Sequence, residues 1–450
     1  MSKSLKLRKG LDIRIKGTAE KILDKPEFPK LFGLRPTDFQ GLVPKLTVKE
    51  GAIVKAGDPL FFDKRNPDIL FTSPVSGTVA SIVRGERRKI LEVTVKPDSE
   101  ISYASFAKGQ PSAMQREEVI QNLLKSGVWP LIRQRPYGII ANPADKPKAI
   151  FVSGFDSSPL APDMDYVLKE YGHELQIAFD ALKKLTDGKV YLTLNGKYEA
   201  AKVFSALKGV EINYIQGPHP AGNVGVQIHH INPINKGEVI WTVNPQDLVI
   251  IGKLFDKGVF DASRIIALTG SEVKTPRYYR TFLGASIESM VLGNVSDGNL
   301  RYISGNVLSG TKISAHGFIG FYDSQITVIP EGDYYEFFGW ANPGFSKFST
   351  SRTFFTWLSP RKKYRIDTNL KGGERAFVMT GEYERVLPMD ILPQFLIKAV
   401  MVKDIDKMEQ LGIYEVVEED LALCEFVCTS KIEVQHILRE GLQLMIKELS

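Results

Sequence analysis

The spacing of apolar residues changes along this chain from a period of two to a helical period, which limits the fold to separate β and α/β units. Between residues 42 and 96, apolar and polar side chains alternate, as in the run over residues 91–95, and turns at Gly51, Gly57 and Gly77 interrupt the pattern. An alternation of this kind turns one face of each strand inward. This part of the chain is therefore predicted to fold into short β-strands.

A helical pattern replaces the alternation near residue 115. Val119, Ile120 and Leu123 recur at helical spacing, and Ser112 is a suitable cap for the start of that helix. Residues 148–155 have the pattern of a buried strand, and residues 173–196 that of a helix followed by a turn and a strand. A strand, helix and strand at this spacing predict a parallel α/β layer.

The last 190 residues contain two more patterns. Residues 263–330 consist mainly of short β segments joined by Gly, Ser and Asn turns, and residues from about 383 are helical. Within the helical part, one stripe is formed by Val434, Ile437, Leu438, Leu442 and Met445. Such a stripe is far more often core than cofactor contact. These changes of pattern divide the chain into residues 1–112, 113–260, 261–330 and 331–450.

Composition excludes several classes of protein. No run reaches the ~18 apolar residues of a membrane-spanning helix, and the basic N-terminus is not followed by the apolar stretch of a secretory signal. Two cysteines, Cys424 and Cys428, are too few for a disulfide framework or a four-ligand cluster. We therefore expect a cytoplasmic chain.

Positive charge is concentrated in the first quarter of the chain. The net charge of the whole chain is +6, whereas residues 1–110 contain 21 Lys and Arg against 13 Asp and Glu. This asymmetry favours an acidic partner, a membrane surface or nucleic acid, and it also fits an ordinary solvated face. No recognised motif supports nucleic-acid binding.

Residues 45–62 and 71–83 form two similar glycine-punctuated segments, and together they resemble the barrel-sandwich fold of biotinyl and lipoyl carrier domains. In such domains a lysine at a hairpin tip is modified, and Lys64 is the residue that superficially matches. Pro67 and the length of the excursion before Gly77 argue against a tight carrier turn, and an exposed lysine is usually only solvated. A carrier or scaffold protein is nevertheless the alternative function that we keep.

A more specific resemblance covers almost the whole chain, from Leu7 to the C-terminal helices. The passages that carry it are Val243-Asn244, Thr269-Gly270, and residues 304–310, 321–354 and 420–428. On these passages the chain is identified as a member of the NqrA family, whose members are subunits of the sodium-translocating NADH:quinone reductases. This family is related to RnfC and to the flavin subunit of respiratory complex I.

The resemblance implies an α/β and β multidomain fold. Residues 1–112 would hold an N-terminal extension and the barrel-sandwich domain, and residues 113–260 a Rossmann-like α/β domain. Residues 261–330 would form a β-grasp, SLBB-like domain, and residues 331–450 a linker and a helical domain.

The resemblance also implies a function. The chain would be a peripheral subunit on the cytoplasmic face of the bacterial inner membrane, helping to form or cover the site of quinone reduction beside the NqrB-like membrane subunit. FMN, FAD, riboflavin and iron–sulfur centres would belong to partner subunits. This chain would carry no redox cofactor and, when isolated, no catalytic activity.

The redox sites of the relatives are altered here. The glycine-rich flavin loop of the complex I subunit corresponds to residues 126–137, where bulky side chains and two prolines follow Gly127 and would obstruct a phosphate. A second flavin passage, residues 153–159, keeps little more than Asp156 and Pro159. Cys424 and Cys428 do not supply the four cysteines of the family's iron–sulfur site, and we expect no bound cluster.

Quinone is the small molecule that the resemblance implies. Its head group needs hydrogen-bond donors and its tail needs an apolar groove. Two stretches combine both properties, residues 28–36 and residues 129–137. The candidate residues are Phe28, Phe32, Arg35, Trp129, Arg133, Arg135 and Tyr137. A proline-bounded loop covering the core is an equally good interpretation of the first stretch.

Three of the six histidines fall close together, at His219, His229 and His230. A metal or proton-transfer site is one interpretation of this cluster. No carboxylate lies between them, and adjacent histidines in a strand would point to opposite faces. We therefore expect ordinary structural histidines, and we predict no metal site and no catalytic residue in this chain.

Overall fold

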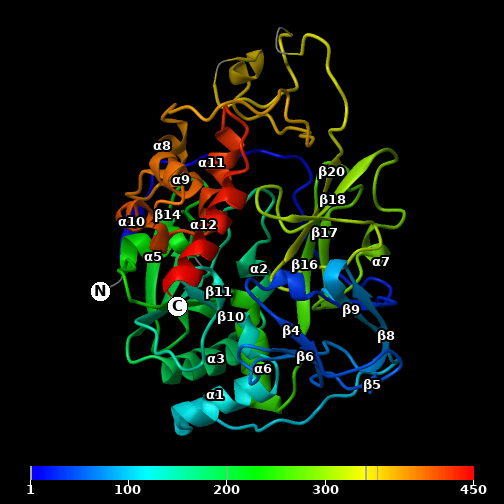
Figure 1. The fold of residues 1–450 in the computed structure, drawn as a ribbon. Helices are drawn as coiled ribbons and strands as arrows, with labels where there is room; N and C mark the ends of the chain where they lie inside the picture. Colours follow the sequence, from blue (N-terminus) through cyan, green and yellow to red (C-terminus); the bar gives the residue numbers. More distant parts are fainter. Residues whose placement is uncertain (1–2, 200, 340–341, 352, 450) are drawn as a thin grey trace.

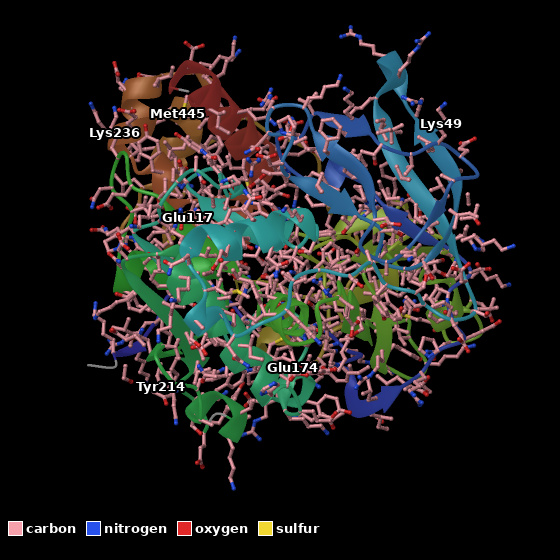
Figure 2. The ribbon with its side chains drawn as sticks, turned by 90° about the horizontal axis from the view of Figure 1, so that it is seen from below. Lys49, Glu117, Glu174, Tyr214, Lys236 and Met445 are labelled. Atoms are coloured by element: carbon pink, nitrogen blue, oxygen red, sulfur yellow. The ribbon has the colours of Figure 1, made fainter. Side chains whose placement is uncertain are left out.

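The computed structural model describes residues 3–199, 201–339, 342–351 and 353–449. Figure 1 shows a central α/β body, with the barrel-sandwich strands at its lower right and a second sheet above them. The C-terminal helices cover the other side of the body. Figure 2 shows the same arrangement from below, with Lys49 of the barrel-sandwich and Met445 of the last helix at opposite ends.

The alternating pattern over residues 42–96 does form strands, arranged in two small sheets. The larger sheet has the order β3 (Phe32–Leu34), β9 (Ile90–Pro97), β8 (Gly77–Arg84) and β5 (Ile53–Val54). The smaller one has the order β4 (Pro44–Leu46), β6 (Pro59–Asp63) and β7 (Leu70–Thr72). Phe61, Phe71 and Val93 are fully buried between them. Lys64 lies exposed in the turn after β6, and its modification stays a prediction.

The α/β body is built on a seven-stranded sheet. Its strand order is β1 (Ser4–Lys6), β14 (Glu211–Gln216), β13 (Lys189–Asn195), β12 (Ala149–Ser153), β15 (Ile240–Val243), β10 (Ile132–Arg135) and β11 (Ile139–Ile140). The pairings from β1 to β15 are parallel, as the sequence predicts, whereas β10 and β11 are antiparallel.

Helices cover both faces of this sheet because its strands alternate between two cores. Ile150 and Val152 face α1 (Arg116–Lys125), α3 (Gly172–Leu185) and α6 (Pro245–Lys257), whereas Ala149 and Phe151 face α5 (Val224–Ile231). The short helices α2 (Met164–Leu168) and α4 (Lys202–Ser205) lie in the connections.

The predicted cap at Ser112 is wrong, because α1 begins four residues later. Gln115 precedes the helix, and its backbone N–H donates to the Glu118 carboxylate at 2.8 Å. The carboxylate thus occupies an N–H group at the helix start, as in a capping box. Ser112 instead lies in a separate 3-10 turn, Pro111–Ala113.

The second sheet has six strands. Their order is β19 (Thr311–Ile313), β18 (Leu300–Ser304), β20 (Gln325–Pro330), β16 (Ser263–Thr269), β17 (Arg277–Phe282) and β2 (Glu20–Asp24). The short helix α7 (Glu288–Val291) follows β17. The predicted β segments of residues 263–330 are therefore present.

Residues 3–24, here called the N-terminal strap, connect three parts of the molecule. Strand β1 pairs with β14 of the α/β body, and β2 pairs with β17 of the second sheet. Between these strands, Ile13 and Ile15 are buried in the core of the C-terminal helices. The strap therefore lies outside the two barrel-sandwich sheets.

The C-terminal helices form their own core. They are α8 (Glu382–Val386), α9 (Pro393–Met401), α10 (Ile405–Gln410), α11 (Ala422–Val427) and α12 (Val434–Leu449). The predicted stripe is confirmed for Val434, Leu438, Leu442 and Met445, which have no exposed surface, whereas Ile437 is only partly buried. Cys424 and Cys428 are free thiols buried in this core. None of the helices in the described residues is long and apolar enough to cross a bilayer.

Candidate functional site

A cavity of about 390 Å³ lies at the carboxyl ends of β12 and β15. Ser153 ends β12, and Asn244 directly follows β15. From β12 the sheet continues to β13 and β14 on one side and to β15 on the other, so the strand order reverses at this point. In open α/β sheets, ligands bind in the crevice at such a reversal.

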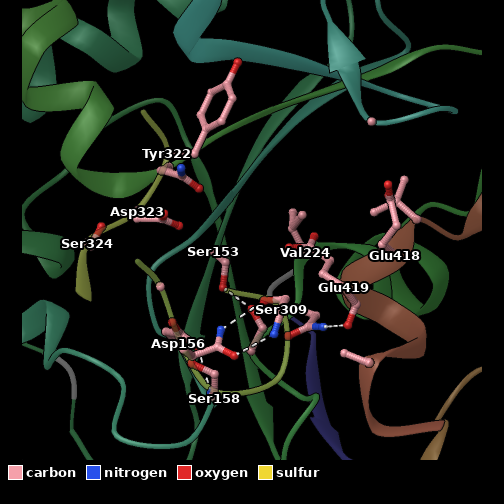
Figure 3. Close-up of a pocket in the computed structure, with 18 of the residues that line it drawn as sticks. Ser153, Asp156, Ser158, Val224, Ser309, Tyr322, Asp323, Ser324, Glu418 and Glu419 are labelled. Atoms are coloured by element: carbon pink, nitrogen blue, oxygen red, sulfur yellow. Dashed lines mark hydrogen bonds between the residues drawn. The ribbon is translucent and has the colours of Figure 1, made fainter. Parts of the chain in front are cut away.

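All four regions of the chain contribute to the cavity lining. Asp38 comes from the barrel-sandwich region, Asp156 from the α/β body, Asp323 from the second sheet, and Glu418 and Glu419 from the C-terminal helices. Figure 3 shows Asp323 on one side of the cavity and Glu419 on the opposite side. Because none of these regions encloses the cavity by itself, the site exists only in the assembled chain.

The lining is predominantly acidic. Five carboxylates border it, at the positions just named, and Arg133 and Arg439 line it with them. Arg439 pairs with Glu418, and from behind the lining Arg35 pairs with Asp38 and Arg135 with Glu419. Three of the five carboxylates therefore have a guanidinium beside them.

Arg133 is fixed against an aromatic ring at the cavity. Its guanidinium carbon lies 4.8 Å from the ring centroid of Tyr322. The Tyr322 hydroxyl donates to the Pro130 carbonyl at 2.7 Å, which holds the ring in place. Burial raises the pKa of Tyr322, although Arg133 opposes the shift, so the phenol stays neutral. A cation stacked on a held ring keeps its N–H groups available at its edge.

Two carboxyl groups of the lining have unusual environments. The Phe321 N–H donates to Asp38 at 3.0 Å, and the Ser304 hydroxyl donates to Asp323 at 2.6 Å. Burial raises the pKa of both carboxyls, although Arg35 partly offsets the shift in each case. These are the environments in which a carboxylic acid can hold a proton that it would otherwise lose.

Arg135 lies behind the cavity lining and forms an ion-pair network with the lining residue Glu419 and with Asp420. Its guanidinium lies 2.7 Å from Glu419 and 2.5 Å from Asp420, and only 3% of its side chain is exposed. Burial raises the pKa of Asp420, and Arg135 counteracts this shift. Gly225 of α5 leaves room for this ion pair. A side chain at position 225 would place its Cβ 2.4 Å from the Arg135 guanidinium.

His219 lies at the cavity with a serine beside it. Its Nδ1 is 3.0 Å from the Ser157 hydroxyl, and its own burial lowers its pKa. The neighbouring Ser158 lines the cavity and is 8% exposed, and its hydroxyl has no hydrogen-bond partner among the described residues. A buried hydroxyl without a partner is costly, so a ligand group there would be stabilised.

The two predicted quinone stretches have different locations. In the second stretch, Arg133 lines the cavity, whereas Trp129 is fully buried in the core, donates from its indole to Ala141 at 2.7 Å and packs on Trp241. The Tyr137 carbonyl accepts from Arg439 at 2.8 Å. Of the candidates in this stretch, only Arg133 lines the cavity, whereas Arg135 and Tyr137 contact the lining residues Glu419 and Arg439.

The first stretch lies mostly outside the cavity. The rings of Phe28 and Phe32 contact each other at 5.6 Å and both contact Phe282, at the junction of the barrel-sandwich and the second sheet. Phe32 is buried, whereas Phe28 is 44% exposed. Arg35 differs, because it pairs with Asp38 at 3.1 Å and so supports one of the cavity carboxylates.

The expectation of a strand at His229 and His230 is wrong, because both lie on α5. His229 Nδ1 is 2.7 Å from Glu415, and His230 Nε2 is 2.8 Å from the Pro388 carbonyl. Both rings thus connect α5 to the C-terminal region. Across the described ranges, no group of three or more His, Cys, Asp or Glu residues is placed to hold a metal ion.

Sequence reasoning missed most of the acidic lining. Asp38, Asp323 and Glu418 lie in separate regions of the sequence, and only their folded positions bring them together. Asp156 carried a usable signal, because it follows a predicted buried strand whose carboxyl end marks a crevice. The run of three acidic residues at 418–420 was a second indication of an acidic site.

Three family models match successive parts of this chain. Residues 5–98 match the NqrA N-terminal barrel-sandwich hybrid domain, residues 114–260 the NqrA second alpha/beta domain, and residues 265–315 the NQRA C-terminal domain, which is an SLBB domain. Together these matches agree with the two small sheets, the α/β body and the six-stranded sheet.

Full-length relatives agree with the family models. The chain is 39% identical over 449 residues to the NqrA subunit of the Na(+)-translocating NADH-quinone reductase of Rhodopirellula baltica, covering 98% of each chain. It is 40% identical over 448 residues to the same subunit of Neisseria meningitidis, covering 99% of this chain and 100% of the relative. The corresponding protein of Yersinia pestis is 39% identical over 450 residues, and the match covers 99% of this chain and 100% of the relative.

A solved structure, an air-oxidised NAD+-reducing [NiFe]-hydrogenase, aligns much more loosely. The TM-score is 0.40 and the identity 13%, over 77% of this chain and 67% of the hydrogenase chain. A likeness of this size adds nothing to the fold assignment.

Proposed function

The chain belongs to the NqrA family of the Na+-translocating NADH-quinone reductases, and on this premise we propose that it forms part of the quinone-reduction site. It is a subunit of that reductase, and other subunits of the complex are its partners. In the proposal, the chain contacts an NqrB-like membrane subunit on the cytoplasmic face of the membrane. It shapes or covers the quinone site and carries no redox cofactor itself.

The observation that carries this proposal is the position of Arg133. Its guanidinium stacks on Tyr322 and faces a cavity at the strand-order reversal, as described above. A quinone oxygen accepts hydrogen bonds, and its affinity for a guanidinium donor grows as negative charge develops on reduction. The Ser158 hydroxyl, which lacks a partner among the described residues, is a further donor in the same cavity.

Reduction of a quinone to a quinol takes up two electrons and two protons. In the proposal, the electrons come from the redox centres of partner subunits, and the protons come from acids near the quinone oxygens. Asp38 and Asp323 suit the second task because burial raises the pKa of both carboxyls. After each proton transfer, the carboxylate takes up a new proton from water.

The test is a comparison of quinone kinetics in the purified reductase complex. The Arg133→Gln substitution removes the charged donor and is expected to raise the KM for a soluble quinone analogue by roughly ten- to a hundredfold, since such hydrogen bonds contribute ~1.5–3 kcal/mol. NADH oxidation with an artificial acceptor that bypasses the quinone site should be unchanged.

Arg385→Gln provides the matched control, because the side chain of this arginine is 74% exposed and pairs with a neighbouring glutamate of α8. Its KM for quinone should equal that of the wild type. An unchanged KM in the Arg133 variant, with the complex intact, would refute the proposed role of the cavity. Titration of the purified chain with the analogue then shows whether the chain binds quinone without its partners.

A further inference from the structure

Residues 334–363, here called the aromatic arm, differ in composition from the rest of the chain. They contain ten aromatic residues in 30 positions, whereas aromatic residues make up 10% of the whole sequence. Among the described residues of the arm, the 3-10 turn Phe355–Leu358 is the only helical element. Segments of this length without regular structure are uncommon in compact domains and are usually functional.

Several large apolar side chains of the arm are exposed to solvent, although Phe348 and Phe354 are partly buried. Tyr335 is fully exposed, and Phe337, Phe345, Leu358 and Phe355 are 88%, 65%, 63% and 52% exposed. Figure 1 shows this segment projecting at the end of the molecule away from the barrel-sandwich. Large exposed apolar patches are rare on monomeric proteins and mark interaction sites.

The beginning of the arm is nevertheless tightly fixed. Just before it, the Glu331 carboxylate accepts hydrogen bonds from Arg301 at 2.6 and 2.8 Å, from Lys312 at 2.9 Å and from Thr368 at 2.6 Å. The Gly332 N–H donates to Thr368 at 2.8 Å. These bonds hold the two ends of the arm together.

The far end of the arm is fixed by the N-terminal strap. The backbone N–H of Tyr364 donates to the Arg14 carbonyl at 2.8 Å, and that of Lys16 donates to the Tyr364 carbonyl at 2.9 Å. The ring of Phe348 packs on Tyr364 and Phe426 at 5.4 and 5.8 Å. The base is therefore preorganised, and the apolar tip is presented outward.

Three exposed cations follow the aromatic tip, at the end of the arm. Within the tip, Glu336 and Lys347 form an ion pair at 2.6 Å and neutralise each other. Arg361, Lys362 and Lys363 are exposed at the end of the arm. An aromatic centre with a charged rim is the anatomy of a protein–protein interface, in which aromatic residues and arginine dominate the binding energy.

We propose that the aromatic arm is the surface through which this chain docks on another subunit of the reductase. The partner surface would offer an apolar groove for the aromatic rings and carboxylates opposite the three cations. This inference rests on membership of the complex and is independent of the proposed quinone role.

A lipid surface fits the arm less well than a protein does. Segments that bind a bilayer surface are typically long amphipathic helices with a continuous apolar face. The described residues of the arm contain only a four-residue helical turn, which presents no such face. The observations therefore favour a protein partner.

The experiment measures how well the chain is retained in the complex during purification from membranes. A Phe337→Ser, Phe345→Ser double variant removes two exposed aromatic side chains. It should weaken the association of this chain with the complex by roughly ten- to thirtyfold. We expect the membrane subunits to lose this chain, whereas the thermal midpoint of the isolated chain stays unchanged.

An Ile53→Ser, Leu292→Ser double variant is the matched control, because these side chains are 84% and 79% exposed elsewhere on the surface. It should remain in the complex like the wild type. Equal retention of the arm variant would overturn the proposal, whatever its effect on quinone kinetics.

A second measurement separates the two classes of partner. The isolated chain is floated with vesicles that contain anionic phospholipid, at physiological salt. Vesicle binding that the arm variant abolishes would assign the arm to lipid and would overturn the protein interface. Absence of such binding, together with loss of the variant from the complex, supports it.

Discussion

At the residue scale, the wall of the cavity depends on two arginines of one strand. Arg133 and Arg135 are two positions apart on β10, yet their surroundings differ, since one stacks on Tyr322 and the other is buried between Glu419 and Asp420. The sequence indicated both residues as quinone donors. It could not distinguish them, because their partners lie nearly 190 and 285 residues further along the chain.

Arg135 is predicted to be a stabilising residue rather than a quinone ligand. Arg135→Met would leave the buried carboxylate of Asp420, and the partly exposed one of Glu419, without their cation. Removing one partner of a buried pair typically costs about 3–5 kcal/mol. Urea denaturation should show a loss of this size in the free energy of unfolding.

Arg385→Met is the comparison for that experiment, because an exposed pair contributes at most about 1 kcal/mol. If both variants lose the same small amount of stability, the Arg135 network is not important for the fold.

At the scale of elements, long periodic segments were predictable and short ones were not. The strand–helix–strand order of residues 148–196 and the stripe of α12 follow from apolar periodicity, which is strong over these lengths. In contrast, β1 is only three residues long, and its pairing with β14 depends on a partner some 210 residues away. No local pattern contains that information.

The base of the aromatic arm is predicted to loosen in acid. The hydrogen bond from Arg301, with those from Thr368 and Lys312, lowers the pKa of Glu331 below its ordinary 4.5, despite burial. A carboxyl with a lowered pKa contributes stability above its unfolded pKa and loses it as the pH falls. Protection of the amides around Gly332, expressed relative to their intrinsic exchange rates, should therefore decrease below about pH 4.5.

Glu331→Gln should produce the same loss of protection already at neutral pH, because the side-chain amide cannot form the ion pairs. Glu382→Gln, which removes a partly exposed carboxylate of α8, should leave exchange at Gly332 unchanged. Equal exchange in the Glu331 variant and the wild type would contradict the proposed fastening of the arm.

At the scale of the whole molecule, the cavity depends on the relative positions of four regions. Apolar periodicity and family resemblance predicted the order and type of these regions. Neither predicted that Asp38, Asp323 and Glu418 meet, because contacts between domains have no local signature. The cavity and its acidic character are therefore properties of the assembled chain.

The N-terminal strap is predicted to make these regions unfold together. Deleting residues 1–24 removes one strand from each of two sheets and two core residues, Ile13 and Ile15, from the C-terminal helices. Calorimetry should show a single transition for the full chain and separate, lower transitions for the truncated one. Removing only residues 1 and 2 is the control, and a single unchanged transition after the long deletion would contradict the prediction.

The strap also imposes an order of events on the ribosome. Strand β1 ends at Lys6, but its partner β14 begins at Glu211 and the partner of β2 begins at Arg277. At ~5–20 residues per second, β1 waits roughly 10–40 s for its neighbour. During this interval the basic strap of a nascent chain remains unpaired, because neither of its partner strands has yet been made.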